Sequence, residues 1–296
     1  MKLLFVIPDN DPKTTNQFLQ ILEITDFLKN KINFFIIVEK RFPLIIRPLV
    51  LLYARSMGYK KAYIYYSYSS LILAKLVGCQ TFFWHCYWNA PKTLLLKLCL
   101  QVTDYLVTGT KSSAANYRNR FNLTFTKIKV LPSWINLKKF YIPKIDHSGK
   151  TVLFYPRLTL SKGSDWLPEI VKKLGKHKFD IIDGAVPNSE IPIRLAASDL
   201  YVLPSRGEGL PRAILEAMAA GVPFVTTNIG GINDIVTKFQ KQCLINFGDT
   251  VKFVAKSKEI LHDSALARKL IDDGHRQVKK YDIANVAKLF YKLMSD

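Results

Sequence analysis

Cysteine, acidic residues and long apolar runs are scarce in this sequence, and each scarcity excludes a class of protein. The four cysteines, Cys79, Cys86, Cys99 and Cys243, form no Cys-x-x-Cys pair, which argues against a zinc site and a disulfide framework. A chain of 296 residues buries enough core to need no disulfides, so we interpret them as reduced thiols of a cytoplasmic protein. The longest uncharged apolar stretches, residues 62–74 and 76–91, are too short or too polar to span a bilayer, which takes about 20 apolar residues.

The amino-terminal segment lacks the features of a secretory signal peptide. Its apolar run, residues 3–8, meets Asp9 and Asp11 with no small-residue cleavage site. We therefore predict a first strand here.

Composition and length indicate a folded protein with two domains. Apolar residues make up 49% of the chain and aromatic residues 12%, which excludes intrinsic disorder. At roughly 150 residues per domain, the length fits two domains.

Positive charge is concentrated in the first half of the chain. The formal net charge is +20; residues 1–145 hold 21 basic and 6 acidic residues, and the remainder hold 22 and 17. Between residues 27 and 103, eleven basic residues stand against one acid, Glu39, and Arg55, Lys60 and Lys61 lie among aliphatic and aromatic residues. This composition is typical of a surface on anionic lipid headgroups. Nucleic-acid binding and a merely solvated basic face are the alternatives.

Short apolar runs alternate with longer amphipathic segments in the first half. The pattern predicts strands at residues 2–7, 32–38, 61–66, 81–84 and 105–108, and helices at residues 14–29 and 43–57 and from near Pro91 and Lys111. Runs such as FFIIV and YLV are typical of strands buried on both faces, so we expect a parallel sheet covered by helices.

Residues 131–150 have prolines and basic residues without a period and are predicted to be a linker. The alternation then restarts, with strands at residues 151–155, 179–182, 200–203 and 223–226 and helices at residues 164–174 and 211–220. We therefore predict two similar α/β halves, and a cleft between such halves is the usual ligand site.

The window of residues 203–236, LPSRGEGLPRAILEAMAAGVPFVTTNIGGINDIV, concentrates the chemistry. A predicted strand runs into a glycine-containing loop that holds Glu208, and a helix entered at Pro211 holds Glu216. Backbone N–H groups at a helix start favour phosphate or sugar oxygens, and carboxylates accept hydrogen bonds from vicinal hydroxyls. Both carboxylates are therefore predicted to face one cleft.

The same window resembles the retaining, nucleotide-sugar-dependent glycosyltransferases of GT-B fold, family 4, also called glycosyl transferases group 1. The matching residues are Pro204, Ser205, Glu208, Gly209, Glu216, Ala217, Met218, Ala219, Gly221, Pro223, Gly230 and Gly231. The resemblance implies that Glu208, Gly209 and Leu210 hold the donor sugar and that Glu216 binds the nucleotide ribose. It also places Pro211, at the entry to the helix, in the donor site.

A second match lies at residues 155–163, YPRLTLSKG, where Arg157 and Lys162 share one loop after an apolar strand. Two cations there can neutralise a diphosphate leaving group. The segment is similar to the family's Gly-Arg-Leu and Lys-Gly element, which implies that both side chains grip the donor diphosphate. Pro156 stands where the family often has glycine.

Two weaker matches complete the expected site. Asp183 begins DGAVP, which resembles the family's turn near the nucleotide base. His85 follows a predicted strand, where the family often has a histidine near the donor sugar and the acceptor; a structural role is the alternative.

The first loop departs from the family. Family members commonly have glycines there, whereas this chain has Asp9-Asn10-Asp11-Pro12-Lys13-Thr14-Thr15. The donor phosphate contact is then either lost or supplied by Thr14, Thr15 or Asn16 at the helix start. The Asp-x-Asp match is a common turn composition, and we expect no metal or other cofactor because the cationic side chains serve that purpose.

These observations predict a GT-B enzyme with two Rossmann-like domains, residues 1–140 and 141–280, and a carboxy-terminal helix, residues 281–296, that packs toward the first. We expect a metal-independent retaining glycosyltransferase that moves a sugar from a nucleoside-diphosphate donor to a hydroxyl acceptor, a lipid-linked or envelope glycan at the inner membrane face. The alternatives are an epimerase or phosphorylase of the same fold, or a non-catalytic basic protein that binds nucleic acid or an anionic surface. Nucleic-acid binding requires no such pair of carboxylates, so we do not expect it.

Overall fold

Two parallel sheets form the framework of the protein, each in its own unit. The computed structural model describes residues 1–8, 16–123, 127–145, 150–154, 158–183 and 186–295. Unit 1 comprises Met1–Pro132 and Ile283–Asp296, and unit 2 comprises Ser133–Asp282. Every strand pairing described in both sheets is parallel, as the apolar strands predicted.

Unit 1 has a sheet of six described strands in the order β2-β1-β3-β4-β5-β6. The strands are β1 (Lys2–Ile7), β2 (Asn33–Val38), β3 (Lys61–Tyr65), β4 (Gln80–Trp84), β5 (Tyr105–Thr108) and β6 (Lys127–Val130). The helices are α1 (Asn16–Leu28), η1 (Glu39–Arg41), α2 (Arg47–Ser56), α3 (Tyr68–Leu76), α4 (Leu94–Val102), α5 (Lys111–Phe121) and α13 (Ile283–Ser295).

Local sequence explains where several of these helices begin. Ser67, Thr93 and Thr110 precede α3, α4 and α5, and each side-chain oxygen accepts a hydrogen bond from the backbone N–H three residues later. Such a cap satisfies one of the donors that a helix start leaves unpaired.

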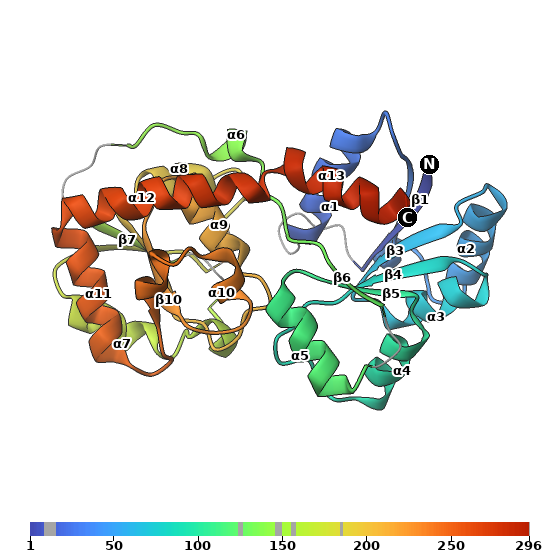
Figure 1. Cartoon of the computed structure of the whole chain (residues 1–296), viewed down its shortest axis with the longest axis horizontal. Helices are drawn as coiled ribbons and strands as arrows, with labels where there is room; N and C mark the ends of the chain where they lie inside the picture. Colours follow the sequence, from blue (N-terminus) through green and yellow to red (C-terminus); the bar gives the residue numbers. More distant parts are fainter. Residues whose placement is uncertain (9–15, 124–126, 146–149, 155–157, 184–185, 296) are drawn as a thin grey trace. The chain divides into compact units, whose positions relative to one another are not determined.

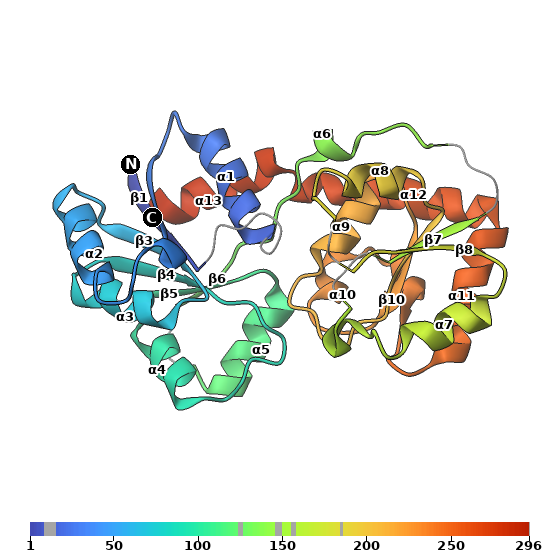
Figure 2. The same cartoon turned by 180° about the vertical axis from the view of Figure 1, so that it is seen from behind.

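The two faces of the first sheet are covered by different helices (Figures 1 and 2). On one face α13 packs on β1 and β3, where the Phe290 ring stacks on Phe5 with centroids 5.8 Å apart and lies 5.4 Å from Tyr63. On the other face, alternate β1 residues such as Leu4 and Val6 join a buried cluster with residues of α2, α3, α4 and α5. Alternation along β1 thus divides the core of unit 1 into two layers.

Unit 2 has a sheet of five described strands in the order β11-β10-β9-β7-β8. The strands are β7 (Thr151–Phe154), β8 (Lys178–Ile181), β9 (Leu200–Leu203), β10 (Phe224–Thr227) and β11 (Leu244–Ile245). The helices are α6 (Leu137–Phe140), η2 (Leu160–Lys162), α7 (Leu167–Leu174), α8 (Ile191–Ala196), α9 (Arg212–Ala219), α10 (Ile232–Ile235), η3 (Gln240–Cys243), α11 (Thr250–His262), α12 (Ser264–Val278) and η4 (Lys279–Tyr281).

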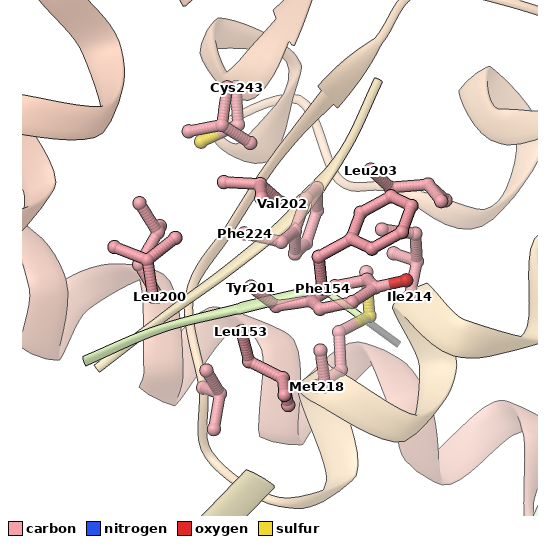
Figure 3. Packing of buried hydrophobic residues seen from close by; sticks show 14 of the residues in the cluster. Leu153, Phe154, Leu200, Tyr201, Val202, Leu203, Ile214, Met218, Phe224 and Cys243 are labelled. Carbon is pink, nitrogen blue, oxygen red and sulfur yellow. The ribbon is translucent and has the colours of Figure 1, made fainter. Parts of the chain in front are cut away.

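The core of unit 2 lies between its strands and α9. Leu153 and Phe154 of β7 and Tyr201 of β9 pack with Ile214 and Met218 of α9 (Figure 3). The buried residues of α9 are apolar apart from Glu216, so the helix is held firmly against the sheet. The packing of α9 on the sheet positions the loop of residues 204–211, which leads into the helix.

Several predicted elements differ from the structure. α2 begins at Arg47 and α7 at Leu167, later than the predicted starts at residues 43 and 164, and each helix has a proline in its first turn, where proline is favourable. α3 and β6 were not predicted. The predicted strand at residues 151–155 ends at Phe154, and Tyr155 lies outside the described residues.

The predicted linker is largely part of unit 2, which begins at Ser133 rather than at residue 141. Trp134, Ile135 and Phe140 are buried, and Ile135 forms a parallel bridge with Asp282. Ile135 and Phe140 belong to the buried cluster of unit 2, which the irregular sequence pattern of the segment did not indicate.

No helix in the described parts of the chain is both long and apolar enough to cross a bilayer.

Candidate functional site

The candidate site lies where β7 and β9 of unit 2 end, in the loops that lead from these strands toward η2 and α9. In open parallel sheets, the carboxyl ends of the strands are where ligands bind, because the loops there converge and the following helices begin. Residues 158–163 and 204–211 belong to these two loops. The structure brings the two loops into direct contact.

Glu208 is the centre of the contact. Its Oε1 atom lies 2.6 Å from Lys162 Nζ and accepts a hydrogen bond of 2.7 Å from Ser205 Oγ. Glu208 is buried, whereas the Lys162 side chain is partly exposed. The ion pair and the hydrogen bond hold this buried carboxylate in a fixed orientation. The predicted pair of Glu208 and Lys162 is thus adjacent in space.

Two glycines permit the close approach of these loops. At Gly230 (φ +57°) an added Cβ would lie 1.7 Å from the Glu208 carbonyl oxygen, and at Gly163 (φ +77°) it would lie 2.0 Å from the Pro204 carbonyl oxygen. Both residues have the left-handed backbone that side chains disfavour. Glycine is therefore required at both positions by conformation and by space.

Arg206 connects the loop of residues 204–211 to η2 and to the turn before α7. Its guanidinium group pairs with Asp165 and lies over the Phe247 ring, 4.4 Å from the centroid. Its backbone N–H donates to the Ser161 carbonyl oxygen over 2.9 Å. The bidentate pair and the stacked ring hold the segment around Lys162 in place.

The helix α9 carries the second carboxylate. Glu216 is buried in α9 and forms an ion pair with Arg212 one turn earlier, with Arg212 Nε 2.9 Å from Glu216 Oε1. Burial and the negative charges of Glu208 and Glu216 raise the pKa of Tyr201. The Tyr201 side chain is therefore a neutral phenol in the electrostatic field of both carboxylates. Gly209, Leu210 and Pro211 lead directly into α9, and no side-chain cap is described at its start.

Asp183 lies beside the loop of residues 158–163. Its Oδ1 atom accepts a hydrogen bond of 2.6 Å from the Leu158 backbone N–H. The structure thus ties the end of β8 to the segment that holds Lys162. Arg157 lies outside the described residues, as do Thr14 and Thr15.

His85 belongs to unit 1, at the carboxyl end of β4. It is buried, its Nε2 atom lies 3.2 Å from Tyr68 Oη, and its Nδ1 atom lies within hydrogen-bond distance of Tyr117 Oη. Burial lowers the pKa of His85 to about 4, so the ring is neutral at physiological pH. Tyr66 (φ +51°) and Tyr87 pack against the same ring.

The arrangement in unit 2 combines a cation, two buried carboxylates and a helix start. Such a set binds a ligand that is anionic at one end and rich in hydroxyl groups at the other. Among the described residues, no group of three or more His, Cys, Asp or Glu side chains is placed to hold a metal ion.

The sequence did not reveal the roles of Arg206, Arg212 and Gly163. Each acts through a partner far along the chain or one helical turn away, and their residue types alone are common on surfaces. The spacing of Arg212 and Glu216, four residues apart in a predicted helix, was the one available signal.

The second half of the chain matches a known protein family. Residues 176–277 match the family described as Glycosyl transferases group 1. This range includes Glu208 and Glu216 and begins after Lys162.

Curated relatives match about a third of the chain. The putative teichuronic acid biosynthesis glycosyltransferase TuaC of Bacillus subtilis is 33% identical over 108 residues, which are 36% of this chain and 24% of that protein. The UDP-Gal:alpha-D-GlcNAc-diphosphoundecaprenol alpha-1,3-galactosyltransferase of Escherichia coli is 37% identical over 100 residues, 32% of this chain and 26% of that protein. The chain thus spans about a quarter of the length of these relatives.

Solved structures resemble the whole chain. A sucrose-phosphate synthase from Thermosynechococcus elongatus has a TM-score of 0.83 at 15% identity and covers 100% of this chain and 98% of that one. Anabaena HepE, in complex with UDP and glucose, has a TM-score of 0.76 at 15% identity and covers 100% and 99%. The predicted fold class, GT-B with two parallel-sheet α/β domains, is confirmed.

Proposed function

We propose that the chain is a retaining glycosyltransferase of the glycosyl transferases group 1 family, whose model matches residues 176–277, built on the GT-B fold. It moves a sugar from a nucleoside-diphosphate donor to a hydroxyl acceptor. The observation that carries the proposal is the contact of Lys162 with Glu208, 2.6 Å long, within the loops at the carboxyl ends of β7 and β9.

The proposed roles follow from the charge of each group. Lys162, with Arg157, stabilises the negative charge that develops on the departing diphosphate. Glu208 accepts hydrogen bonds from the donor sugar, and Glu216 accepts them from the ribose hydroxyls. Because Lys162 also holds Glu208, one cation aligns the sugar with its leaving group.

The proton of the acceptor hydroxyl is received by the leaving diphosphate. No general base is assigned, in keeping with the resemblance to retaining enzymes of this fold. The work of the protein is then to position the donor and to neutralise charge. His85, neutral and hydrogen-bonded to two tyrosines, serves the sugar and the acceptor as a hydrogen-bonding group rather than as an acid.

The proposed acceptor is a glycan or a lipid-linked glycan at the inner face of the cell membrane. Two observations support it. The names of the Bacillus subtilis and Escherichia coli relatives refer to teichuronic acid biosynthesis and to a diphosphoundecaprenol acceptor. The first half of this chain also carries the excess of basic residues that anionic lipids attract.

Donor binding is tested by thermal unfolding with UDP, GDP, ADP and their common sugar conjugates. A ligand at 100 times its dissociation constant adds about 2.7 kcal/mol, which raises the melting temperature of a domain of this size by about 5–10 °C. Glu216→Gln and Lys162→Gln are expected to abolish most of this shift.

Matched controls separate the site from general effects of charge. Glu190 and Arg194 form an i,i+4 ion pair like that of Glu216 and Arg212, and Lys173 forms an exposed pair, so Glu190→Gln and Lys173→Gln should keep the full shift. If no nucleotide raises the melting temperature, or if the site variants respond as their controls do, the donor site is wrong.

The reaction is tested with the donor that binds. Release of nucleoside diphosphate together with a new glycosidic bond of unchanged anomeric configuration supports sugar transfer with retention. Conversion of the donor to an epimeric sugar nucleotide, or release of a sugar phosphate, would instead assign the epimerase or phosphorylase reaction.

A further inference from the structure

An exposed aliphatic surface covers the outer side of α2 in unit 1. The turn before the helix presents Leu44 and Ile45, and the helix itself presents Leu49, Leu52 and Tyr53. Ile45 is 84% exposed and Leu49 is 66% exposed. Isolated exposed apolar residues are ordinary, but a contiguous group indicates an interaction surface.

The same surface continues over the two neighbouring helices. α2 packs beside α3, and α3 packs beside α4; Figure 2 shows α3 and α4 next to each other. On α3, Leu76 is 77% exposed, and on α4, Leu94 is 73% exposed. We call this surface, on the outer sides of α2, α3 and α4, the aliphatic face; its exposed apolar residues are Leu44, Ile45, Ile46, Leu49, Leu52, Tyr53, Ile72, Leu76, Leu94, Leu95, Leu98 and Val102.

The core of unit 1 does not explain this face. The inner sides of the three helices are already buried against the sheet, through residues such as Leu51, Leu71 and Leu96. Each helix is therefore apolar on both its inner and its outer side. A helix that is apolar on both sides is expected inside a large core or against a membrane, yet the outer side chains of these three helices are exposed.

The charges around the face are predominantly positive. No acidic residue occurs between positions 40 and 103, and exposed basic residues border the face, among them Lys60, Lys92 and Lys97. Two acids flank this stretch: Glu39 is buried and accepts hydrogen bonds from Ser67 and Ser70, and Asp104 forms an ion pair with Lys75 of α3. The surface thus combines aliphatic side chains with a predominantly positive border.

This combination favours an anionic lipid bilayer over nucleic acid and over a second copy of the chain. Nucleic acid is bound by cations and stacking aromatic rings at the contact, whereas the most exposed side chains here are Ile45, Leu76 and Leu94. A symmetric dimer through this face would bring the same basic border against itself. Aliphatic side chains enter the acyl boundary while the basic border stays among headgroups.

We propose that the aliphatic face of unit 1 docks onto an anionic lipid bilayer, with α2 and its preceding turn lying in the interface. The helices are nine or ten residues long, too short to span a bilayer, so the protein rests on the membrane. The inference rests on the proposed function, since it names the surface that brings the enzyme to an acceptor carried by lipid.

The test is cosedimentation of the whole protein with vesicles of phosphatidylcholine alone and of phosphatidylcholine with phosphatidylglycerol. Wild-type protein is expected to bind the anionic vesicles at least tenfold more tightly than the neutral ones and to lose affinity as salt is raised. The double variant Ile45→Ser, Leu49→Ser should bind at least tenfold more weakly, a change of 1.4 kcal/mol. A second double variant, Leu76→Ser, Leu94→Ser, probes α3 and α4 in the same way.

The matched control carries the same chemical change on unit 2. Ile193 of α8 and Val251 of α11 are exposed aliphatic residues of that unit, and Val251 is 72% exposed. Ile193→Ser, Val251→Ser should bind vesicles within twofold of wild type.

Three results would overturn the proposal: no binding of wild-type protein to anionic vesicles, equal binding by the Ile45, Leu49 variant, or a dimer in solution that this variant dissociates. The nucleotide-dependent melting shift, measured on the same variants, reports the donor site separately. If wild-type protein binds anionic vesicles but shows no nucleotide-dependent melting shift, the proposed function is refuted and the docking surface stands. If wild-type protein shows the melting shift but does not bind anionic vesicles, the docking alone is refuted.

Discussion

Replacing Gly230 with alanine should disable the donor site while leaving the fold intact. The new Cβ would lie 1.7 Å from the Glu208 carbonyl oxygen, and side chains are not found closer than about 3.0 Å, so the loop must move by about 1.3 Å. A displacement of about 1 Å at a binding group costs on the order of a hundredfold in rate. We therefore expect Gly230→Ala to lower kcat/KM by about a hundredfold and to remove most of the nucleotide-dependent melting shift.

The cost to stability is smaller and can be separated by a control. A left-handed backbone (φ +57° at Gly230) costs an alanine about 1–2 kcal/mol, or a few degrees in melting temperature. Gly248 has φ +87° and no atom within 4 Å of an added Cβ, so Gly248→Ala carries the backbone cost without the collision. Thermal unfolding and donor turnover of both variants check the reasoning. If Gly230→Ala turns over donor as Gly248→Ala does, the close approach is not what positions Glu208.

Other parts of the structure make equally direct predictions. Burial lowers the pKa of His85 to about 4 from about 6.5 in the unfolded chain, so the free energy of unfolding falls by about 3 kcal/mol as the pH drops from about 6.5 to about 4. The melting temperature should therefore decrease more steeply over this pH range for wild type than for His85→Gln. Phe290→Ala should cost about 3–5 kcal/mol because the ring is fully buried, whereas Leu289→Ala, at an exposed neighbour, should change the melting temperature little. Arg206→Leu should raise the donor KM with little change in melting temperature, because its pair with Asp165 is exposed; an unchanged KM would show that this pair does not position the loop.

The sequence predicts the strands better than the helix boundaries. β1, β5 and β9 have the predicted bounds, because a strand buried on both faces is a short apolar run with polar ends. α3 was missed because residues 68–76 lie in an apolar stretch where helix and strand patterns look alike. β6, KIKV, is short and half charged, and only its pairing with β5 identifies it as a strand.

The sequence predicted those parts of the candidate site whose residues are close together along the chain. Glu208 and Glu216 share one loop-helix segment, so their spacing could be interpreted. The contact of Lys162 with Glu208 joins loops 46 residues apart, and only the family resemblance linked them. Gly163 and Gly230 appeared in the motifs, but the atoms that exclude a side chain there belong to other segments.

The return of α13 to unit 1 has a consequence for synthesis on the ribosome. The face of the first sheet that holds Phe5 and Tyr63 is covered by Phe290, yet about 150 residues of unit 2, Ser133–Asp282, are translated in between. At about 5–20 residues per second, this face waits about 8–30 s for its cover. Unit 2 is contiguous and is complete when Asp282 has emerged, so the unit whose synthesis begins first is the last to fold.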